Sequence, residues 1–214
     1  MKKPTIPVAR EGYPFIAFAG LVTVVFAMLG FVLVSISFLT ITAIILNFFR
    51  DPERVSPDDD DALVSPADGK VILIEKVFDD KYVKEHVYKV SIFMNIFNVH
   101  VNRVPFSGKV KKVIYSPGTF YSANSERSSL ENESCTVIIE TDTGMKLAFS
   151  QIAGLIARRI VCWAEKGDNL SKGERFGLIR FGSRVDLYLP QKTQLEISKG
   201  QRVVAGETVL GYLP

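Results

Sequence analysis

The sequence has few of the residues that most often bind metals or cross-link small folds. It contains two cysteines, Cys135 and Cys162, among 214 residues, and no Cys-x-x-Cys pair. A disulfide-dense framework and a cysteine-based zinc or redox motif are therefore excluded, and both cysteines are expected to be reduced, inert core thiols. The only histidines are His86 and His100, too few for a histidine-rich metal site.

Charge is absent from a long N-terminal stretch, because residues 12–49 include no Asp, Glu, Lys or Arg. As one helix these 38 residues would be about 57 Å long, nearly twice a hydrocarbon core of about 30 Å. Two spans with a turn near Gly30 fit better, so we expect a transmembrane helical hairpin over about 13–49, within an N-terminal anchor of residues 1–49. A single tilted span and a cleaved signal sequence are the alternatives, although the apolar cores of secretory signals are only about 7–15 residues long.

The charges that flank this run predict its orientation. Lys2, Lys3 and Arg10 precede it, and Arg50 and Arg54 follow it. The positive-inside rule then places both ends in the cytoplasm. We therefore expect the chain in the cell (plasma or inner) membrane, with its globular part on the cytoplasmic side.

A segment rich in proline and aspartate, residues 50–62, separates the apolar run from the rest of the chain, and 50–61 has a net charge of −4. This composition indicates an acidic, solvated linker. From 63 to 214 the apolar residues alternate with period two, which predicts a β-rich domain of many short strands. The clearest strands are 70–74, 87–93, 109–115, 135–140 and 185–189. No stripe of basic and aromatic residues indicates a nucleic-acid partner.

An internal repeat narrows the fold class. The segment 167–174 recurs as 200–207, and each copy has a turn glycine, an inward aliphatic residue, a second glycine and a glutamate at the same offsets. Such spacing is typical of the hairpin turns of biotinyl/lipoyl-type barrel sandwiches, and residues 65–71 resemble a further strand of that fold. We therefore predict a mainly β, barrel-sandwich domain behind the helical hairpin. A non-enzymatic lipoyl-like membrane adaptor fits this fold too, although no lysine hairpin for biotin or lipoate is present.

Three segments contain residues capable of chemistry, namely 65–69 with Asp68, 98–105 with His100, and 181–186 with Ser183. Together they supply the carboxylate, base and nucleophile of a serine hydrolase. The α/β-hydrolase form is disfavoured, because 182–185 lacks the second glycine of the G-x-S-x-G motif and the chain lacks βα alternation.

The set of motifs taken together is more specific than its parts. In chain order it consists of an apolar run ending at 47–54, Ser-Pro-Ala-Asp-Gly at 65–69, Asn-Val-His at 98–100, Asn132-Glu133, and Phe-Gly-Ser-Arg-Val-Asp at 181–186. Order and spacing closely resemble the short bacterial and archaeal form of phosphatidylserine decarboxylase proenzymes over essentially the whole chain. The Gly-Ser pair near the C-terminus is the most specific element.

The resemblance implies a membrane-anchored lyase that converts phosphatidylserine to phosphatidylethanolamine and CO₂. The bond between Gly182 and Ser183 would cut itself, giving a β chain, 1–182, and an α chain, 183–214, that stay together as a heterodimer; a higher oligomer is left open. Ser183 would become a covalent pyruvoyl cofactor, which forms a Schiff base with the serine head group of the lipid. Neither a metal nor pyridoxal phosphate is then needed. An archaetidylserine substrate cannot be separated from phosphatidylserine by sequence.

The resemblance also assigns roles to single residues. His100 matches an acid/base position and is our choice for protonating the substrate carbon, because imidazole can donate and accept a proton near neutrality. Asp68 matches another such position and would assist self-cleavage. Arg103 stands where longer members have the second histidine of His-x-x-His, and a guanidinium cannot act as a base. Arg103 and Asn98 are candidate substrate-binding residues instead, with the planar fork of Arg103 suited to a carboxylate or phosphate.

Two segments keep open roles. The Asn132-Glu133 motif is shorter than in the family, so its function is not assigned. Residues 119–133, rich in Ser, Asn and Glu, are expected to form either a flap over the site or an ordinary solvated loop.

Overall fold

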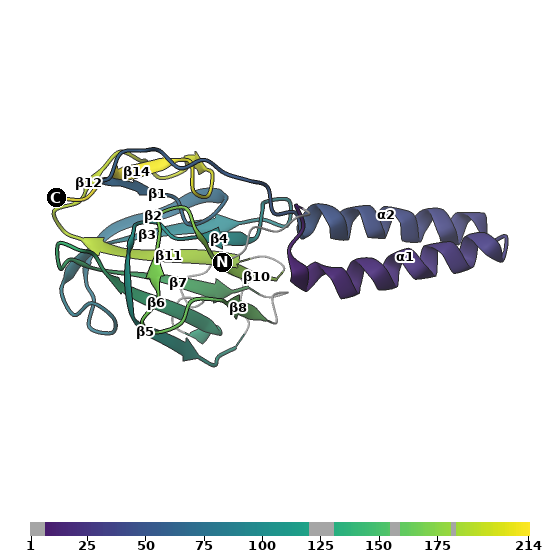
Figure 1. Ribbon diagram of the computed structural model, residues 1–214, viewed down its shortest axis with the longest axis horizontal. Coiled ribbons are helices and arrows are strands. Elements are labelled where there is room, and N and C mark those ends of the chain that lie inside the picture. The colour runs from purple at the N-terminus through teal and green to yellow at the C-terminus, as the bar shows by residue number, and fades with distance from the viewer. Residues whose placement is uncertain (1–6, 120–130, 155–158, 181–182) are drawn as a thin grey trace. The chain divides into compact units, whose positions relative to one another are not determined.

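The computed structural model describes residues 7–119, 131–154, 159–180 and 183–214 (Figure 1). The proposed cleavage partner Gly182 and most of the expected flap, residues 120–130, lie outside the described residues. The chain divides into two units, Met1–Glu53 and Arg54–Pro214.

The first unit is the helical hairpin that the charge-free run predicts. Its elements are η1 (Arg10–Gly12), α1 (Tyr13–Met28) and α2 (Val32–Phe48). Figure 1 shows α1 and α2 side by side, and the turn between them contains Gly30 with φ +78°. The helices pack through a hydrogen bond from Ser35 Oγ to Thr23 O (3.3 Å) and through stacked rings of Phe26 and Phe38. The predicted pair of helices and the turn near Gly30 are confirmed, and the crossing of a membrane by both helices stays a prediction.

The outer surface of this hairpin is apolar. Met28 and Leu33 are 83% and 82% exposed, and only 11% of the span Arg10–Met28 is buried. Among the described residues this 19-residue span is the one helix long and apolar enough to cross a membrane, while α2 is apolar but has 17 residues. An apolar surface of this kind is costly in water and favourable in lipid, so the unit is compatible with membrane association.

The second unit is mainly β, as predicted. Its largest sheet has the order β13-β2-β3-β11-β7-β6-β5-β9, with antiparallel neighbours, and two three-stranded sheets, β1-β14-β12 and β4-β10-β8, complete it. The strands of the large sheet are β2 (Gly69–Phe78), β3 (His86–Met94), β5 (Gly108–Ser116), β6 (Ser134–Glu140), β7 (Lys146–Ala153), β9 (Asn169–Leu170), β11 (Ser183–Pro190) and β13 (Arg202–Val203). The small sheets contain β1 (Ala62–Val64), β4 (Val101–Arg103), β8 (Ile160–Cys162), β10 (Arg175–Ile179), β12 (Gln194–Leu195) and β14 (Val209–Tyr212).

Strand β11 runs through the middle of the large sheet, between β3 and β7 (Figure 1). Val185 and Leu187 on one of its faces join the main hydrophobic core, in which Ile92 of β3 and Phe149 of β7 are also fully buried. All five strands expected from the alternation of apolar residues are present, including 185–189 inside β11. The apolar alternation therefore located the strands that form the core.

The opposite face of β11 is buried as well, although it is charged. Arg184 Nη2 donates hydrogen bonds to Ser91 Oγ of β3 (2.7 Å) and to Asp186 Oδ2 (3.0 Å). Asp186 is 0% exposed. The burial of Tyr188, together with the negative charge of Asp186, raises the pKa of the Tyr188 phenol. A buried ion pair of this kind needs all its hydrogen bonds. It therefore holds the first residues of β11 in register with β3.

The repeat has the geometry expected from its glycines. The inward aliphatic residues of the two copies, Leu170 and Val203, are buried in the core. Four turn glycines have positive φ, a conformation that costs other residues about 1–2 kcal/mol: Gly167 (+100°), Gly173 (+76°), Gly200 (+97°) and Gly206 (+74°). These paired turns agree with the predicted barrel-sandwich class.

Candidate active site

Ser183 is the first residue of β11 and is completely buried. It lies opposite Met94, the last residue of β3, and opposite Ala153, the last residue of β7. Its hydroxyl donates to Met94 Sδ at 3.3 Å, a weak acceptor. The candidate nucleophile is thus held at one end of the central strand, among neutral groups.

Two buried amides extend this neutral environment. Asn102 Nδ2 lies 3.6 Å from Met94 Sδ and 3.4 Å from Pro66 O, and its Oδ1 accepts a hydrogen bond from Gln151 Nε2 (2.9 Å). Gly177 leaves room for this amide, because a Cβ at that position would lie 2.5 Å from the backbone oxygen of Val161 and 2.7 Å from Gln151 Nε2. Sequence reasoning assigned neither amide a role; Asn102 could have been suspected from its place two residues after His100.

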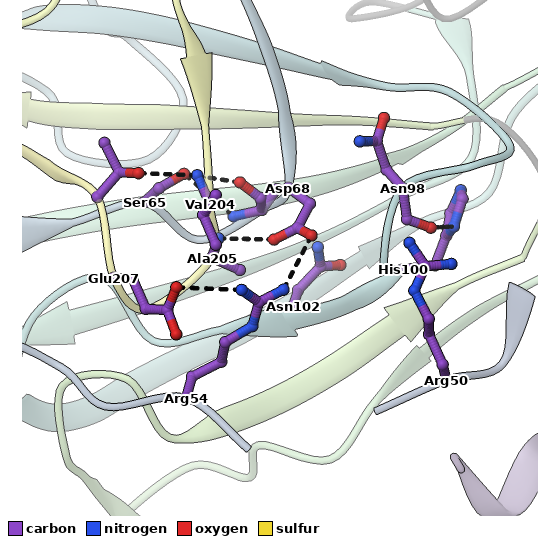
Figure 2. A network of polar contacts seen from close by, with 12 residues as sticks. Arg50, Arg54, Ser65, Asp68, Asn98, His100, Asn102, Val204, Ala205 and Glu207 are labelled. Atoms are coloured by element: carbon purple, nitrogen blue, oxygen red, sulfur yellow. Dashed lines mark hydrogen bonds and ion pairs between the residues drawn. The ribbon is translucent and has the colours of Figure 1, made fainter. Parts of the chain in front are cut away.

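His100 is fully buried just before β4 (Figure 2). Its Nδ1 lies 2.9 Å from Asn98 O, and its own carbonyl accepts a hydrogen bond from Ile179 N (3.3 Å) near the end of β10. Because a carbonyl oxygen can only accept, Nδ1 must bear the proton, and in neutral imidazole Nε2 is then the basic nitrogen. The contact with Ile179 brings His100 beside the strand that leads to Ser183.

Asp68, the residue directly before β2, is held by two donors (Figure 2). Its Oδ1 accepts a hydrogen bond from Ala205 N (2.8 Å), and its Oδ2 pairs with Arg54 Nη2 at 3.1 Å. Arg54 Nη1 pairs in turn with Glu207 Oε2, also at 3.1 Å. Sequence reasoning placed Arg54 in a solvated linker and missed this contact, because nothing in the acidic segment indicates which side chain turns inward.

The two candidate substrate-binding residues contact protein groups. Arg103 is 5% exposed, its N–H donates to Pro66 O (2.9 Å), and its Nη1 donates to Gly173 O (2.8 Å). Asn98 Oδ1 accepts a hydrogen bond from Asn95 N (2.9 Å). These contacts position the segment around His100, and binding of substrate by Arg103 or Asn98 stays a prediction.

The Asn132-Glu133 motif, whose role the sequence left open, lies beside Ser183. Asn132 Nδ2 donates to Ala153 O (2.7 Å), and Ala153 N donates to Glu133 O (2.9 Å). Partial burial and a hydrogen bond to the Glu133 carboxylate raise the pKa of Tyr115. Since Ala153 is the β7 partner of Ser183, the motif fixes one of the two strands that flank the candidate nucleophile.

Cys135 and Cys162 are free thiols, as predicted, although Cys162 is only half-buried. A hydrogen bond with Cys162, together with burial, raises the pKa of Cys135, which favours the unreactive thiol. In the part of the chain that the structure describes, no cluster of three or more His, Cys, Asp or Glu side chains is placed to hold a metal ion.

These contacts do not form a hydrolase triad within the described residues. A triad needs the base hydrogen-bonded to the nucleophile and the carboxylate bonded to the base. Instead Ser183 Oγ faces Met94, His100 Nδ1 faces Asn98 O, and Asp68 is paired with Arg54. Ser183 is also 0% exposed, so its hydroxyl is not open to solvent in this structure.

Comparison with known proteins gives matches over the full chain. The family model described as phosphatidylserine decarboxylase matches residues 41–211, a range that contains Asp68, His100 and Ser183. The phosphatidylserine decarboxylase proenzyme of Desulfotalea psychrophila is 56% identical over 213 residues. Those of Geotalea uraniireducens and Geobacter metallireducens are 49% identical over 214 residues and 50% identical over 219 residues. Each alignment covers 100% of both chains.

Proposed function

Because the chain belongs to the phosphatidylserine decarboxylase family, we propose that it matures by cutting itself before Ser183, which then becomes a pyruvoyl group. The enzyme is a lyase that releases CO₂ from phosphatidylserine and leaves phosphatidylethanolamine. The relatives carry the name proenzyme, and the alignments with them cover the whole chain. Both facts support the maturation step.

The observation that carries the proposal is the place of Ser183. It is fully buried, begins the central strand, and has a strand on each side. A cut before Ser183 would leave the new chain end held by β3 and β7, with the buried Arg184–Asp186 pair directly behind it. The reactive end would therefore keep its position after the backbone breaks.

The maturation needs only atoms of the chain and one water molecule, which supplies the oxygen of the final ketone. Ser183 Oγ attacks the carbonyl carbon of Gly182, and the bond from that carbon to the Ser183 nitrogen breaks, so that the amide becomes an ester. Removal of the Ser183 α-proton expels the Gly182 carboxylate and leaves a dehydroalanine at the new terminus. Hydrolysis of its enamine then releases ammonia and leaves a ketone.

The topology favours an α chain that stays bound to the β chain. Residues 183–214 supply β11 to the middle of the large sheet, β13 to its edge next to β2, and β14 to the middle of a small sheet. Separation would expose core residues such as Val185 and Leu187 and break two strand interfaces of β11. Hydrophobic burial of this extent opposes dissociation.

The ketone fits the residues that surround Ser183. It is small and uncharged, and the group that Ser183 contacts is the Met94 thioether, which is itself contacted by the neutral amide of Asn102. Once formed, it would supply an electron sink for the pair that remains on the substrate carbon after CO₂ leaves. His100 would deliver the proton to that carbon from Nε2 when both of its ring nitrogens are protonated, because its Nδ1 proton is held by Asn98 O.

Replacing His100 with glutamine is expected to lower decarboxylation by about 10²–10⁴-fold, the usual contribution of an acid/base group. The amide can keep the contact with Asn98 O but cannot transfer a proton. Release of ¹³CO₂ from carboxyl-labelled phosphatidylserine measures this loss, and Asn98→Ala serves as a comparison that removes a side chain without removing the backbone acceptor. Unchanged turnover in His100→Gln would exclude His100 as the acid.

We propose that Asp68 supports self-cleavage and that the ion pair with Arg54 holds its carboxylate in place. Both carboxylate oxygens are occupied by donors, and the adjacent Pro66 carbonyl contacts Asn102, which in turn contacts Met94. The motif is thus connected through Asn102 to the residue against which Ser183 lies. These contacts support a positioning role for Asp68.

Replacing Arg54 with glutamine is expected to slow self-cleavage by about tenfold, because a charge-assisted hydrogen bond to Asp68 is lost. Glu207→Gln is the matched control, since it removes the other partner of Arg54 and leaves Asp68 paired. The half-time of fragment appearance after synthesis in vitro is the readout. Equal rates in the two variants would contradict a role for the Arg54–Asp68 pair.

We place the mature enzyme at the cytoplasmic face of the cell membrane, supported by the apolar helix Arg10–Met28 and by the basic residues around it. Denaturing electrophoresis with intact-mass analysis tests the proposal. We expect fragments of 182 and 32 residues, the smaller beginning with a ketone in place of the Ser183 amine. A lipoyl-like adaptor would remain one polypeptide, and that result would overturn the proposal.

A further inference from the structure

The sulfur of Met94 is the atom that the Ser183 hydroxyl contacts. Met94 is fully buried at the end of β3, and its Sδ accepts a hydrogen bond from Ser183 Oγ at 3.3 Å. A thioether is a weak acceptor, so the hydroxyl is oriented without being strongly bound. The O–H donates to the sulfur, and both lone pairs of Oγ are left for an attack on carbon, which needs one of them.

The sulfur itself is held by a buried amide. Methionine is a flexible side chain with three rotatable bonds, so a fixed sulfur needs support. Asn102 supplies it, because its Nδ2 lies 3.6 Å from Met94 Sδ and 3.4 Å from the carbonyl oxygen of Pro66. Since both of these groups are acceptors, the NH₂ end of the Asn102 amide must face them. Met94 Sδ therefore accepts from two donors, Asn102 and Ser183.

Gln151 keeps Asn102 in this orientation, although one of its own atoms stays unpaired. Gln151 is completely buried, and its Nε2 donates to Asn102 Oδ1 at 2.9 Å. Its Oε1 has no hydrogen-bond partner among the described residues, which is unfavourable for a buried acceptor. The reverse orientation would place this oxygen against Asn102 Oδ1, which cannot donate. The orientation of Gln151 thus follows from that of Asn102.

We propose that Met94 is a positioning residue for self-cleavage, and that the Gln151–Asn102 amide chain fixes its sulfur against the Ser183 hydroxyl. The inference rests on the proposed function, because the step that it affects is the attack of Ser183 Oγ. A hydroxyl that is kept in one orientation reaches the attacking geometry more often than one that rotates freely. After maturation the same thioether packs against the methyl group that the Ser183 Cβ becomes.

Norleucine tests the role of the sulfur, because it has the shape of methionine with a CH₂ group in place of Sδ. The full-length chain is made by cell-free synthesis in a Met28→Leu/Met145→Leu background, so that Met94 is the one internal methionine left. Norleucine is expected to slow self-cleavage by about threefold to tenfold, the range for the loss of one hydrogen bond. Selenomethionine keeps an acceptor of similar shape and should give the rate of the methionine chain.

The half-time of fragment appearance on denaturing electrophoresis is the readout. Equal rates with norleucine and methionine would overturn the inference and assign Met94 to packing alone. Equal slowing by selenomethionine and norleucine would contradict it too, because the acceptor would then not matter. A methionine chain that stays uncut would refute the proposed function itself, so the two failures are distinguishable.

A pH profile tests the amide chain independently. In Gln151→Glu the ionised carboxylate cannot donate to Asn102 Oδ1, whereas the protonated carboxyl can. We expect the self-cleavage rate of this variant, relative to the parent chain, to be near the parent value at about pH 5 and about tenfold lower at about pH 8. Gln201→Glu is the matched control, since Gln201 Oε1 accepts from Ser198 N (3.1 Å) and a carboxylate still accepts.

A relative rate that does not change with pH in Gln151→Glu, or that changes equally in Gln201→Glu, would overturn the role of the amide chain. Near-UV circular dichroism at each pH ensures that folded chains are compared. If Gln151→Glu unfolds at the higher pH, the norleucine result decides the inference.

Discussion

Replacing Ser183 with alanine is expected to yield one uncut chain of 214 residues that releases no CO₂ from phosphatidylserine. The hydroxyl is the attacking group, and the atoms of Ser183 are the source of the ketone, so no other residue can replace either contribution. The substitution removes only Oγ and its weak contact with Met94 Sδ, which makes the stability cost about 1 kcal/mol or less. Denaturing electrophoresis and ¹³CO₂ release measure the two losses.

Ser150→Ala is the control for this variant. Ser150 is a buried serine of β7 whose Oγ accepts a hydrogen bond from Thr136 Oγ1 (2.8 Å), and it pairs with Asp186 rather than with Ser183. The Ser150→Ala variant loses a comparable hydroxyl from the same sheet, and we expect it to cut itself and to be active. Fragments or CO₂ from Ser183→Ala would disprove the pyruvoyl mechanism, whereas an uncut Ser150→Ala would show that cleavage responds to packing in general.

Replacing Asp186 with alanine is expected to destabilise the β unit by about 3–5 kcal/mol, because Arg184 would remain in the interior without its counter-ion. Arg184 is 3% exposed, and its other described partner is the Ser91 hydroxyl, which is neutral. In a unit of this size the loss corresponds to a decrease in Tm of roughly 10 °C. Thermal unfolding should be followed in the Ser183→Ala background, so that a single covalent chain unfolds.

The matched variant replaces both charges, with Arg184→Met and Asp186→Leu. Apolar residues of similar volume in place of a buried ion pair are often neutral or stabilising, so the double variant should unfold close to the parent temperature. Similar destabilisation by the single and double variants would mean that the pair itself supplies net stability. Because Arg184 directly follows Ser183, the Asp186→Ala change made in the parent chain is also expected to slow self-cleavage.

The helical hairpin and the strands were predictable from the sequence because each depends on local pattern. A charge-free run twice the length of one membrane span predicts two helices, and Gly30 marks the turn that the structure has. Alternation predicts strands such as 87–93, and the repeated glycines predict turns of positive φ, as at Gly173. Periodicity and backbone conformation are properties of neighbouring residues, so a single chain reveals them.

The candidate site was predictable only in part. The motifs around Asp68, His100 and Ser183 pointed to the family, and the comparisons confirm it over the full length. The amides Asn102 and Gln151 were missed, because a buried asparagine or glutamine leaves no periodic signal and its partner can lie anywhere in the chain. Their hydrogen bond joins residues that are 49 positions apart.

By itself, the sequence determined an apolar hairpin, a β unit with paired glycine turns, and the family to which its motifs belong. Only the tertiary structure decided that Arg54 pairs with Asp68 across 14 residues and that Arg184 reaches Ser91 across 93. The physical reason is that the desolvation of a charge is compensated by whichever donor or acceptor the fold brings within about 3 Å. That proximity is a property of the packed strands, and separation along the chain does not encode it.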